Sequence, residues 1–235
     1  MSAVATAPAD ISDIRRDFPR VSPDVVKKAS QYAASILADV AGRRGALDGR
    51  VAALTPSTRL AGTAFTVEVR AGDNLMIHAA MQLAKPGDVL VIDGKGDRTC
   101  ALMGTIMMNA CVKLGIVGVV IDAAVRDSEE IVEMGFPVYS VGTNPNGPTK
   151  NVPGRIGHAI SCGGVTVRPG DLIVADADGV FVGERERVEA LLPLARKKVE
   201  DESTRIAAIR QGNTSASWLD AALRTAGVLK QGESL

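Results

Sequence analysis

The segment that most constrains the fold is a run of apolar residues that ends in two opposite charges, GIVGVVIDAAVRD at residues 115–127. A short apolar run rich in β-branched residues is typical of a strand buried on both faces, as in a parallel sheet covered by other layers. Such a strand cannot hold bare charges in its middle. We therefore expect Arg126 and Asp127 at its carboxyl end, where ligands of open α/β sheets bind.

The residues around this run follow the order of a βαβ unit. A short strand is predicted at 89–93, a glycine-rich loop at 94–97, a helix at 100–115 and the next strand at 118–124. Upstream, alternation favours a half-buried strand at 63–69, and a helix follows at 75–84. The sequence thus predicts an α/β domain in which strand ends and helix starts converge.

The outer segments complete the expected organisation. One continuous helix is predicted from Ser22 to Gly45, short strands with a β-turn at 176–180 fill the region 158–183, and a charged helix at 185–212 stops at Gly212. A further helix is predicted at 128–135 and a strand at 137–142. We expect a flexible N-terminal arm over 1–22, one domain over 23–212 and a C-terminal extension over 213–235.

The composition argues against several classes of partner. The 235-residue chain carries 27 Lys plus Arg and 27 Asp plus Glu, so no net positive field gathers nucleic acid or an anionic membrane. Only 3% of the residues are aromatic, which leaves few platforms for stacking bases. Cys100, Cys111 and Cys162 lack the spacing of a disulfide framework or zinc site. With no secretory leader or bilayer-length apolar run, we expect a cytoplasmic protein without a nucleic-acid or membrane partner.

Arg126 and Asp127 are the first candidates for chemistry. Arginine presents a planar fork of donors that matches a carboxylate, and an adjoining aspartate suits a hard divalent cation. Together they would suit an anionic, metal-chelating substrate. An ordinary exposed turn, with Asp127 starting the helix that follows, is an equally good interpretation of the same two residues.

The other candidates carry weaker signals. The glycine-rich segment 93–105 precedes a helix whose free N–H groups could bind an anion, but it contains neither a P-loop nor a dinucleotide motif. His78 lies among apolar residues, which favours a core histidine over a ligand or base, and His158 is a similar case. The acidic residues at 176–180 favour a turn over a calcium loop.

Taken together and in order, five segments resemble a known family: GDNLMIHAAM, GDVLVIDGKGD, MGTIMMNACVKLGIVGVVIDAAVRD, FPVYSVGTNPNGPTKNVPG and VRPGDLIVADADGVFV. Over residues 25–212 the chain is similar to the family that joins 4-hydroxy-4-methyl-2-oxoglutarate/4-carboxy-4-hydroxy-2-oxoadipate aldolases to the RraA-like regulators of ribonuclease E. The resemblance implies a single β/β/α domain of the swivelling phosphohistidine-domain type, with a C-terminal helical extension. It also implies homotrimers or homohexamers with active sites between subunits.

For the activity, the resemblance implies a class II pyruvate aldolase that uses Mg²⁺ or Mn²⁺. Such an enzyme cleaves a 4-hydroxy-2-oxo dicarboxylate to pyruvate and decarboxylates oxaloacetate. Asp127 would hold the metal, largely through water, and Arg126 would bind the 2-oxo acid group. Glu202, or Glu200 in a neighbouring register, matches an acid contributed by the adjacent subunit.

The resemblance also assigns the remaining substrate contacts. The backbone amides at a helix start would hold the pyruvate carboxylate or a water, and they belong to Gly104, Thr105, Ile106 and Met107. Asn74 and Lys150 match positions that line the pocket.

At one position the chain departs from the aldolases, which carry an aspartate twenty-one residues before the arginine where this chain has Thr105. Threonine cannot act as a base at neutral pH. Asp93 or Asp97 could supply a carboxylate instead, and decarboxylation of oxaloacetate needs no hydroxyl deprotonation. Two hypotheses follow: a metal-dependent lyase for small oxo acids, or a non-catalytic RraA-like protein that binds a ribonuclease or another macromolecule.

Overall fold

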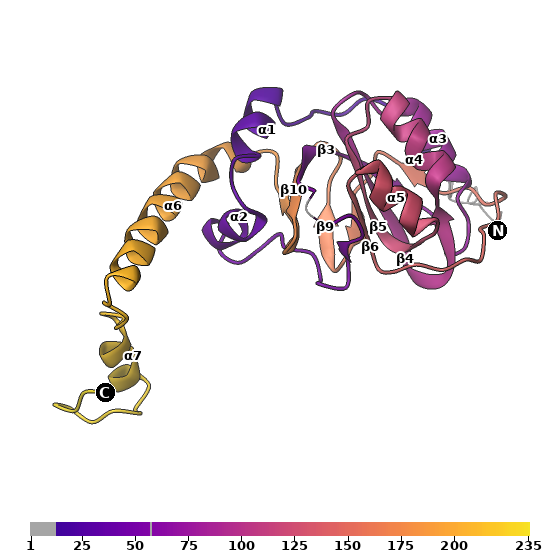
Figure 1. The fold of residues 1–235 in the computed structure, drawn as a ribbon. Helices are drawn as coiled ribbons and strands as arrows, with labels where there is room; N and C mark the ends of the chain where they lie inside the picture. Colours follow the sequence, from indigo (N-terminus) through magenta and orange to yellow (C-terminus); the bar gives the residue numbers. More distant parts are fainter. Residues whose placement is uncertain (1–12, 57) are drawn as a thin grey trace, which may run out of the picture. The chain divides into compact units, whose positions relative to one another are not determined.

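The computed structural model describes residues 13–56 and 58–235, and the described chain divides after Ala195 into two compact units. The first unit contains a mixed sheet of order β1-β7-β3-β4-β5-β6-β2, with the β10–β11 hairpin paired to β3 (Figure 1). Its strands are β1 (Asp13–Ile14), β2 (Ala52–Ala53), β3 (Leu60–Glu68), β4 (Asp88–Met103), β5 (Gly118–Val125), β6 (Val138–Ser140), β7 (Arg155–Ile156), β10 (Leu172–Asp176) and β11 (Gly179–Gly183). A separate pair consists of β8 (Ile160–Cys162) and β9 (Val165–Val167).

The described helices connect or flank these strands. They are α1 (Pro23–Ala29), α2 (Ala34–Val40), α3 (Leu75–Leu83), α4 (Thr105–Lys113), α5 (Ser128–Met134), α6 (Val188–Arg210) and α7 (Leu219–Thr225). The centre of the sheet is parallel: β3 pairs with β4, β4 with β5 and β5 with β6, through crossovers that contain α3, α4 and α5. The predicted βαβ order is confirmed.

Alternate residues of the central strands face two different layers. Leu90 and Ile92 pack with the buried residues of α3, α4 and α5 in one hydrophobic cluster. Val89 and Val91 face the other way and pack with residues of β8 to β11 in a second cluster. The unit is therefore built of strand, strand and helix layers, which confirms the predicted α/β fold.

Strand β5 is buried along its whole length, as its apolar sequence predicts. Asp122, the charge inside it, is only 4% exposed but is not bare. Its Oδ2 accepts hydrogen bonds from Arg50 Nη2 at 2.8 Å and from the Gly163 N–H at 2.9 Å. The strand ends at Val125, so the next two residues, Arg126 and Asp127, lie at its carboxyl end.

Two predicted boundaries are wrong. The continuous helix expected from Ser22 to Gly45 is broken between α1 and α2, because Ala33 is extended and the Ala34 N–H donates to Asp176 Oδ2 at 2.9 Å. This distant carboxylate gives α2 a start of its own.

The helix predicted from residue 100 begins only at Thr105. Strand β4 instead continues through the glycine-rich segment to Met103, with register shifts against β5. Its end is held by long-range backbone hydrogen bonds, including Ala101 N–H to Asn146 O at 2.8 Å. Strand pairing thus prevails over the local helical pattern.

The N-terminal arm was expected to be flexible over 1–22, of which residues 1–12 lie outside the described part of the chain. From residue 13 onward the segment is packed. Strand β1 pairs with β7, and Phe18 contacts the Phe65 ring at 5.6 Å between centroids. Arg20 donates from Nε and Nη2 to the two carboxylate oxygens of Asp88, each at 3.0 Å.

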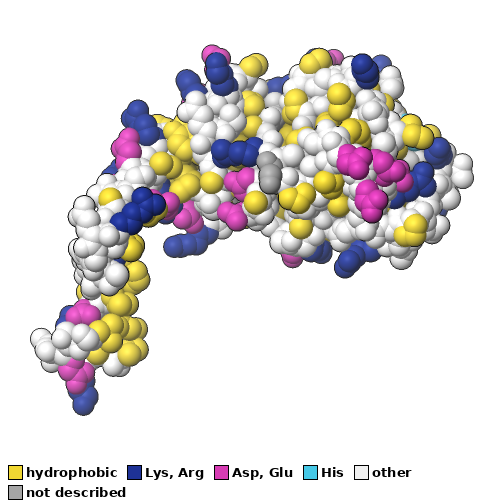
Figure 2. All heavy atoms as spheres, viewed as in Figure 1, with side chains coloured by type: hydrophobic (Ala, Val, Ile, Leu, Met, Phe, Trp, Pro, Cys, Tyr) yellow, Lys and Arg dark blue, Asp and Glu magenta, His cyan; other side chains and the backbone are white. Residues whose placement is uncertain are grey.

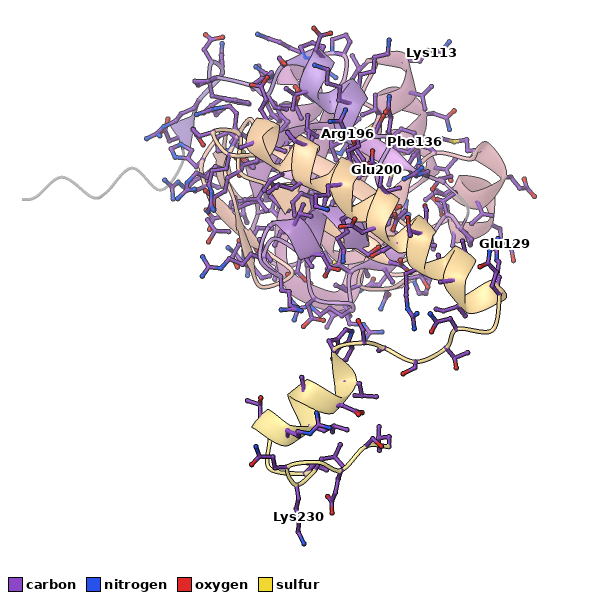
Figure 3. All side chains as sticks on the ribbon, turned by 90° about the vertical axis from the view of Figure 1, so that its left-hand side faces the viewer. Lys113, Glu129, Phe136, Arg196, Glu200 and Lys230 are labelled. Atoms are coloured by element: carbon purple, nitrogen blue, oxygen red, sulfur yellow. The ribbon has the colours of Figure 1, made fainter. Side chains whose placement is uncertain are left out.

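The second unit contains the end of α6, which continues to Arg210, and α7. Gly212, at φ 93°, follows as the predicted stop. The second unit exposes several large apolar side chains (Figure 2): Val199, Ile206, Ile209, Trp218, Val228 and Leu235. Arg196 and Glu200 form an exposed pair one turn apart on α6 (Figure 3). The unit division at Ala195/Arg196 falls inside α6, and the predicted extension 213–235 lies within the second unit.

No helix in the described residues combines the length and apolar character needed to cross a membrane.

Arg20→Ala is expected to lower the free energy of unfolding by about 3 kcal/mol, because it deprives a buried carboxylate of its bidentate partner. Asp88 is 1% exposed, and among the described residues its carboxylate would then keep the Lys85 N–H, at 2.8 Å, as its one donor. Urea denaturation followed by circular dichroism measures the change. Arg16→Ala is the matched control, since Arg16 is exposed, and we expect a change within about 0.5 kcal/mol there. Equal losses in both variants would contradict this account.

Candidate functional site

The two charges that follow β5 are held by the start of α4. Asp127 has left-handed backbone angles, φ 57° and ψ 43°, and precedes α5, but its side chain makes no capping hydrogen bond to that helix. Its Oδ2 instead accepts the Thr105 N–H of α4 at 3.0 Å, and Arg126 Nε lies 3.7 Å from the same oxygen. Asp127 does start α5, as the alternative interpretation expects, and its carbonyl oxygen accepts the Ile131 N–H at 3.1 Å, but its carboxylate does not cap that helix. The carboxylate belongs to the junction between β5 and α4.

A glycine makes this junction possible. A Cβ added to Gly104 would lie 2.4 Å from Asp127 Oδ2 and 3.0 Å from Arg126 Cγ. Any side chain at position 104 would displace the carboxylate or the arginine. The close approach of strand end and helix start thus requires glycine here.

The helix start offers fewer free amides than the resemblance implies. The Thr105 N–H is engaged by Asp127, and the Met107 N–H donates to Gly104 O at 3.0 Å. Among the described residues, the N–H groups of Gly104 and Ile106 have no protein acceptor. They can donate to a bound anion, in the manner usual at helix N-termini.

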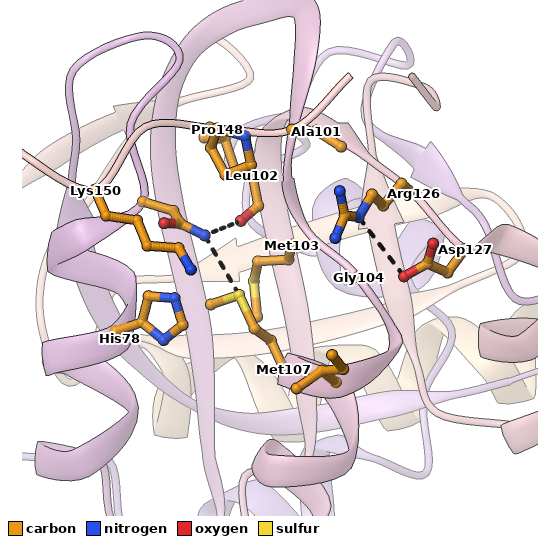
Figure 4. Close-up of a pocket in the computed structure, with 13 residues that line it drawn as sticks. His78, Ala101, Leu102, Met103, Gly104, Met107, Arg126, Asp127, Pro148 and Lys150 are labelled. Carbon is orange, nitrogen blue, oxygen red and sulfur yellow. Dashed lines mark hydrogen bonds and ion pairs between the residues drawn. The ribbon is translucent and has the colours of Figure 1, made fainter. Parts of the chain in front are cut away.

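The junction opens into a pocket of about 270 Å³ (Figure 4). Its lining comes from α3, the end of β4, the start of α4, the end of β5 and the loop before β7: Asn74, His78, Ala101, Leu102, Met103, Gly104, Ile106, Met107, Arg126, Asp127, Gly147, Pro148 and Lys150. In Figure 4, Arg126 and Asp127 occupy one side, and Lys150 and His78 the opposite side. The volume suits a small molecule rather than a drug-sized one.

Seven of the residues proposed from the sequence meet in this lining: Asn74, Gly104, Ile106, Met107, Arg126, Asp127 and Lys150. Thr105 contributes its amide to Asp127, while its buried Oγ1 has no partner within residues 13–56 and 58–235. Glu202 and Glu200 lie in the second unit, where Glu202 is 3.2 Å from Lys198. Their role at a site stays a prediction.

Asn74 is a buried residue of the pocket lining. It is 3% exposed, and its Nδ2 donates to Leu102 O at 2.8 Å and lies 3.5 Å from Met107 Sδ. Its Oδ1 is buried without a hydrogen-bond partner in the described structure. A buried acceptor without a protein donor, on a residue that lines the pocket, is a position where a ligand could donate a hydrogen bond.

The loop that carries Lys150 is fastened by an aspartate that the sequence analysis missed. The carboxylate of Asp73 accepts the N–H groups of Leu75, Asn151 and Val152 and the hydroxyl of Thr149, at 2.7–3.2 Å. Burial disfavours its charged form, yet these hydrogen bonds prevail and lower the pKa of Asp73. The only available signal was its position in the GDN turn that precedes α3.

The two histidines differ. His158 is 4% exposed, as the core interpretation expects, with Nδ1 2.9 Å from Arg155 Nη2 and Nε2 2.9 Å from Asp13 Oδ2. His78 is exposed and lines the pocket, so the core interpretation is wrong for it. Partial desolvation of its ring, and then the charge of Lys150, lower the pKa of His78.

Asp93 and Asp97 do not supply a carboxylate to the pocket. Asp93 is buried beside Lys95 Nζ at 2.7 Å, and Asp97 accepts the N–H and hydroxyl of Thr99. Neither lines the cavity, because β4 continues past both residues as an irregular strand. Their proposed role as substitute bases is therefore not supported by this geometry.

The pocket could hold a hard divalent cation through a single carboxylate. The described residues contain no group of three or more His, Cys, Asp or Glu that could bind a metal. Asp127 is the carboxylate among the lining residues, and its Oδ1 meets no protein donor in the described structure. This donor set fits Mg²⁺ or Mn²⁺ held by one carboxylate, with water and ligand oxygens completing the shell, and it does not fit a protein cage.

Comparison with known sequences gives the family. The family model described as RraA-like, Aldolase/RraA, matches residues 8–182. A Halalkalibacterium halodurans protein, provisionally named 4-hydroxy-4-methyl-2-oxoglutarate aldolase, is 44% identical over 163 residues, which cover 69% of this chain and 78% of that protein. A protein of Deinococcus radiodurans with the same provisional name is 33% identical over 153 residues, covering 65% and 86%.

Solved structures agree in fold. An uncharacterized protein from Pseudomonas syringae superposes with a TM-score of 0.74 at 26% identity, over 84% of this chain and 93% of that one. Streptomyces coelicolor RraAS2, described as an unusual member of the RNase ES inhibitor RraA protein family, also gives 0.74, over 80% and 98% of the two chains. At 23% identity this second likeness concerns the fold alone. With its sequence match and its fold in agreement, the chain belongs to the RraA-like family.

Proposed function

We propose that this protein is a divalent-metal-dependent carbon–carbon lyase that releases pyruvate from small 2-oxo dicarboxylates. The observation that carries the proposal is the junction of Arg126, Asp127 and the free amides of Gly104 and Ile106, which open together into one pocket. The aldolase names of the relatives support a lyase.

The side of the pocket that carries Arg126 and Asp127 would bind the 2-oxo acid group. Arg126, whose side chain is 44% exposed, presents its guanidinium fork to the cavity, and such a fork matches a carboxylate or an adjacent carbonyl oxygen. The amides of Gly104 and Ile106 would donate to the C1 carboxylate. Mg²⁺ or Mn²⁺, when bound at Asp127, would neutralise negative charge that develops on the 2-oxo oxygen.

The opposite wall would recognise the other end of the substrate. Lys150 is the cation on that side, so a distal carboxylate can pair with its ammonium group. A substrate that bridges the two walls is therefore a dicarboxylate. The Asp73 hydrogen bonds fix the loop of Lys150 in advance, which lowers the cost of ordering it on binding.

The reaction follows from this orientation. Cleavage of the C3–C4 bond of a 4-hydroxy-2-oxo acid leaves an electron pair on C3, which is delocalised onto the 2-oxo oxygen. The guanidinium of Arg126 lies where it would stabilise that charge. Loss of carbon dioxide from oxaloacetate generates the same enolate, so the same residues would support both reactions.

We further propose that the protein assembles as a homotrimer or homohexamer in which Glu202 reaches the pocket of an adjacent subunit. Support comes from the second unit, whose apolar residues, such as Ile206 at 48% and Trp218 at 66% exposed, are left uncovered in one chain. Association with further copies would bury this surface. Light scattering on the purified protein measures the assembly, and a monomer would contradict the proposal.

Asp127→Asn is expected to lower kcat for pyruvate release by about 10²–10³-fold, because the neutral amide cannot balance the charge of a divalent cation. A coupled lactate dehydrogenase assay, with and without chelator, measures the rate for oxaloacetate and a 4-hydroxy-2-oxo diacid. Asp178→Asn, at an exposed residue of the β10–β11 turn, is the matched control and should match the wild type. Full activity after metal removal would contradict the proposal.

Gly104→Ala is expected to lower kcat/KM by about 10-fold or more, since loss of a charge-assisted hydrogen bond costs about 1.5–3 kcal/mol. The added Cβ would lie 2.4 Å from Asp127 Oδ2 and force that carboxylate off the Thr105 amide. Hydrogen exchange of the Thr105 amide should accelerate in parallel. Gly49→Ala, where a Cβ meets nothing within 4 Å, is the control. Unchanged exchange at Thr105 would show that the junction tolerates a side chain.

A second candidate function, a non-catalytic regulator that binds a ribonuclease, is favoured by Thr105, which brings no carboxylate to the helix start. Binding to purified ribonuclease E, measured by calorimetry, separates the two functions. Stoichiometric binding together with no turnover of any oxo acid would favour the regulator.

A further inference from the structure

The pocket must supply a proton acceptor if it cleaves a 4-hydroxy-2-oxo acid, because the C4 hydroxyl becomes a carbonyl as the C3–C4 bond breaks. Most lining side chains cannot serve. Arg126 and Lys150 are cations without an acceptor lone pair, and the Asn74 amide is not basic. Asp127 already accepts the Thr105 amide and is the residue suited to the cation.

His78 is the lining side chain that these exclusions leave. It lies on α3, one turn after Asn74, and its ring faces the cavity beside the Lys150 ammonium group (Figure 4). The wall it occupies is opposite Arg126. A substrate held at Arg126 by C1 and C2 and at Lys150 by its distal carboxylate therefore presents C3 and C4 between them, toward the imidazole.

The surroundings of His78 favour the neutral form of its imidazole ring, which can accept a proton. Among the described residues, the charged groups that share the pocket with His78 are Lys150, Arg126 and Asp127. Desolvation of the ring, and then the positive charge of Lys150, lower the pKa of His78, which favours the neutral ring with a free nitrogen lone pair.

We propose that His78 is the catalytic base of the aldol cleavage, an inference that rests on the proposed lyase function. Its free ring nitrogen takes the C4 hydroxyl proton, the O–H electron pair forms the new C=O bond, and the C3–C4 pair moves onto the pyruvate enolate. The imidazolium then returns its proton to C3, which yields pyruvate and regenerates neutral His78. Each proton and electron pair is accounted for without a further reactant.

This role separates the two reactions of the pocket. Oxaloacetate has no C4 hydroxyl to deprotonate, and its decarboxylation leaves an enolate that water can protonate. A change at His78 should therefore affect cleavage and spare decarboxylation. A merely structural role would affect both reactions alike.

The test measures both reactions in His78→Gln. Cleavage of a 4-hydroxy-2-oxo diacid should fall by about 10²–10⁴-fold, the usual contribution of a positioned base, while oxaloacetate decarboxylation stays within about 3-fold of wild type. His158→Gln is the matched control, because the other histidine lies outside the pocket, and its ratio of the two rates should equal that of wild type. A parallel fall of both reactions in His78→Gln, or no fall in cleavage, would overturn the role of His78.

Failure of the proposed function has a different signature. A wild-type protein that turns over neither substrate, with or without Mg²⁺, would overturn the lyase and the base together. Wild-type cleavage with an unchanged His78→Gln ratio would overturn the base alone. His78→Ala supplies a further arm: added imidazole should restore part of its cleavage rate, and no restoration would count against proton transfer at this position.

The pKa of His78 gives a readout that is independent of activity. Proton NMR titration should find it below the ordinary histidine value in wild type, and Lys150→Met should raise it by removing the neighbouring charge. The acidic limb of the cleavage rate should follow the wild-type value, since protonation below that pKa removes the base. An unchanged histidine titration in Lys150→Met would contradict the pocket electrostatics.

Discussion

The hydrogen bond from the Thr105 amide to Asp127 Oδ2 joins the end of β5 to the start of α4, and the arrangement of the site depends on it. It places a carboxylate at the positive end of a helix, where negative charge is favoured. It also turns Asp127 away from α5, the helix it precedes, and leaves Arg126 at the pocket wall. Gly104 is the steric condition for this contact, because any Cβ there would occupy the space of the carboxylate.

The opposite wall is organised by a second carboxylate with a different task. Asp73 gathers donors from its own turn and from residues 149–152, and so ties the loop of Lys150 to the beginning of α3, which carries His78. One aspartate thus faces the cavity while the other supports the loop behind it. The apolar floor between them, with Leu102, Met103 and Met107, limits the cavity to small ligands.

Local sequence patterns were sufficient where structure is decided locally. The buried strand β5, the helices α3 and α5 and the β10–β11 turn follow their periodicity and turn residues. The break between α1 and α2 depends on Asp176, which is 142 positions from Ala34, and the extension of β4 depends on Asn146. In both cases the two residues are too far apart in the sequence for a local pattern to reveal their contact.

In the candidate site, too, local sequence patterns predicted some residues and missed those that depend on distant contacts. Arg126 and Asp127 could be proposed from the pattern alone, because charges that follow a fully buried strand are expected at its exposed carboxyl end. The family resemblance supplied five more residues of the lining: Asn74, Gly104, Ile106, Met107 and Lys150. His78 could not be distinguished from a core residue, because its apolar neighbours in sequence pack inward while its own ring faces the pocket. The role of Asp73 depends on a loop more than 70 residues away.

The buried Asn74 Oδ1 has a consequence for how the protein responds to its ligand. Among the described residues this oxygen has no protein donor, and Asn74 belongs to the pocket lining. A molecule that brings a hydroxyl or ammonium hydrogen to it would gain a hydrogen bond worth about 0.5–1.5 kcal/mol, which a molecule of the same shape without that hydrogen would lack. Because a ligand that binds only the folded state stabilises it, the melting temperature should distinguish two such molecules.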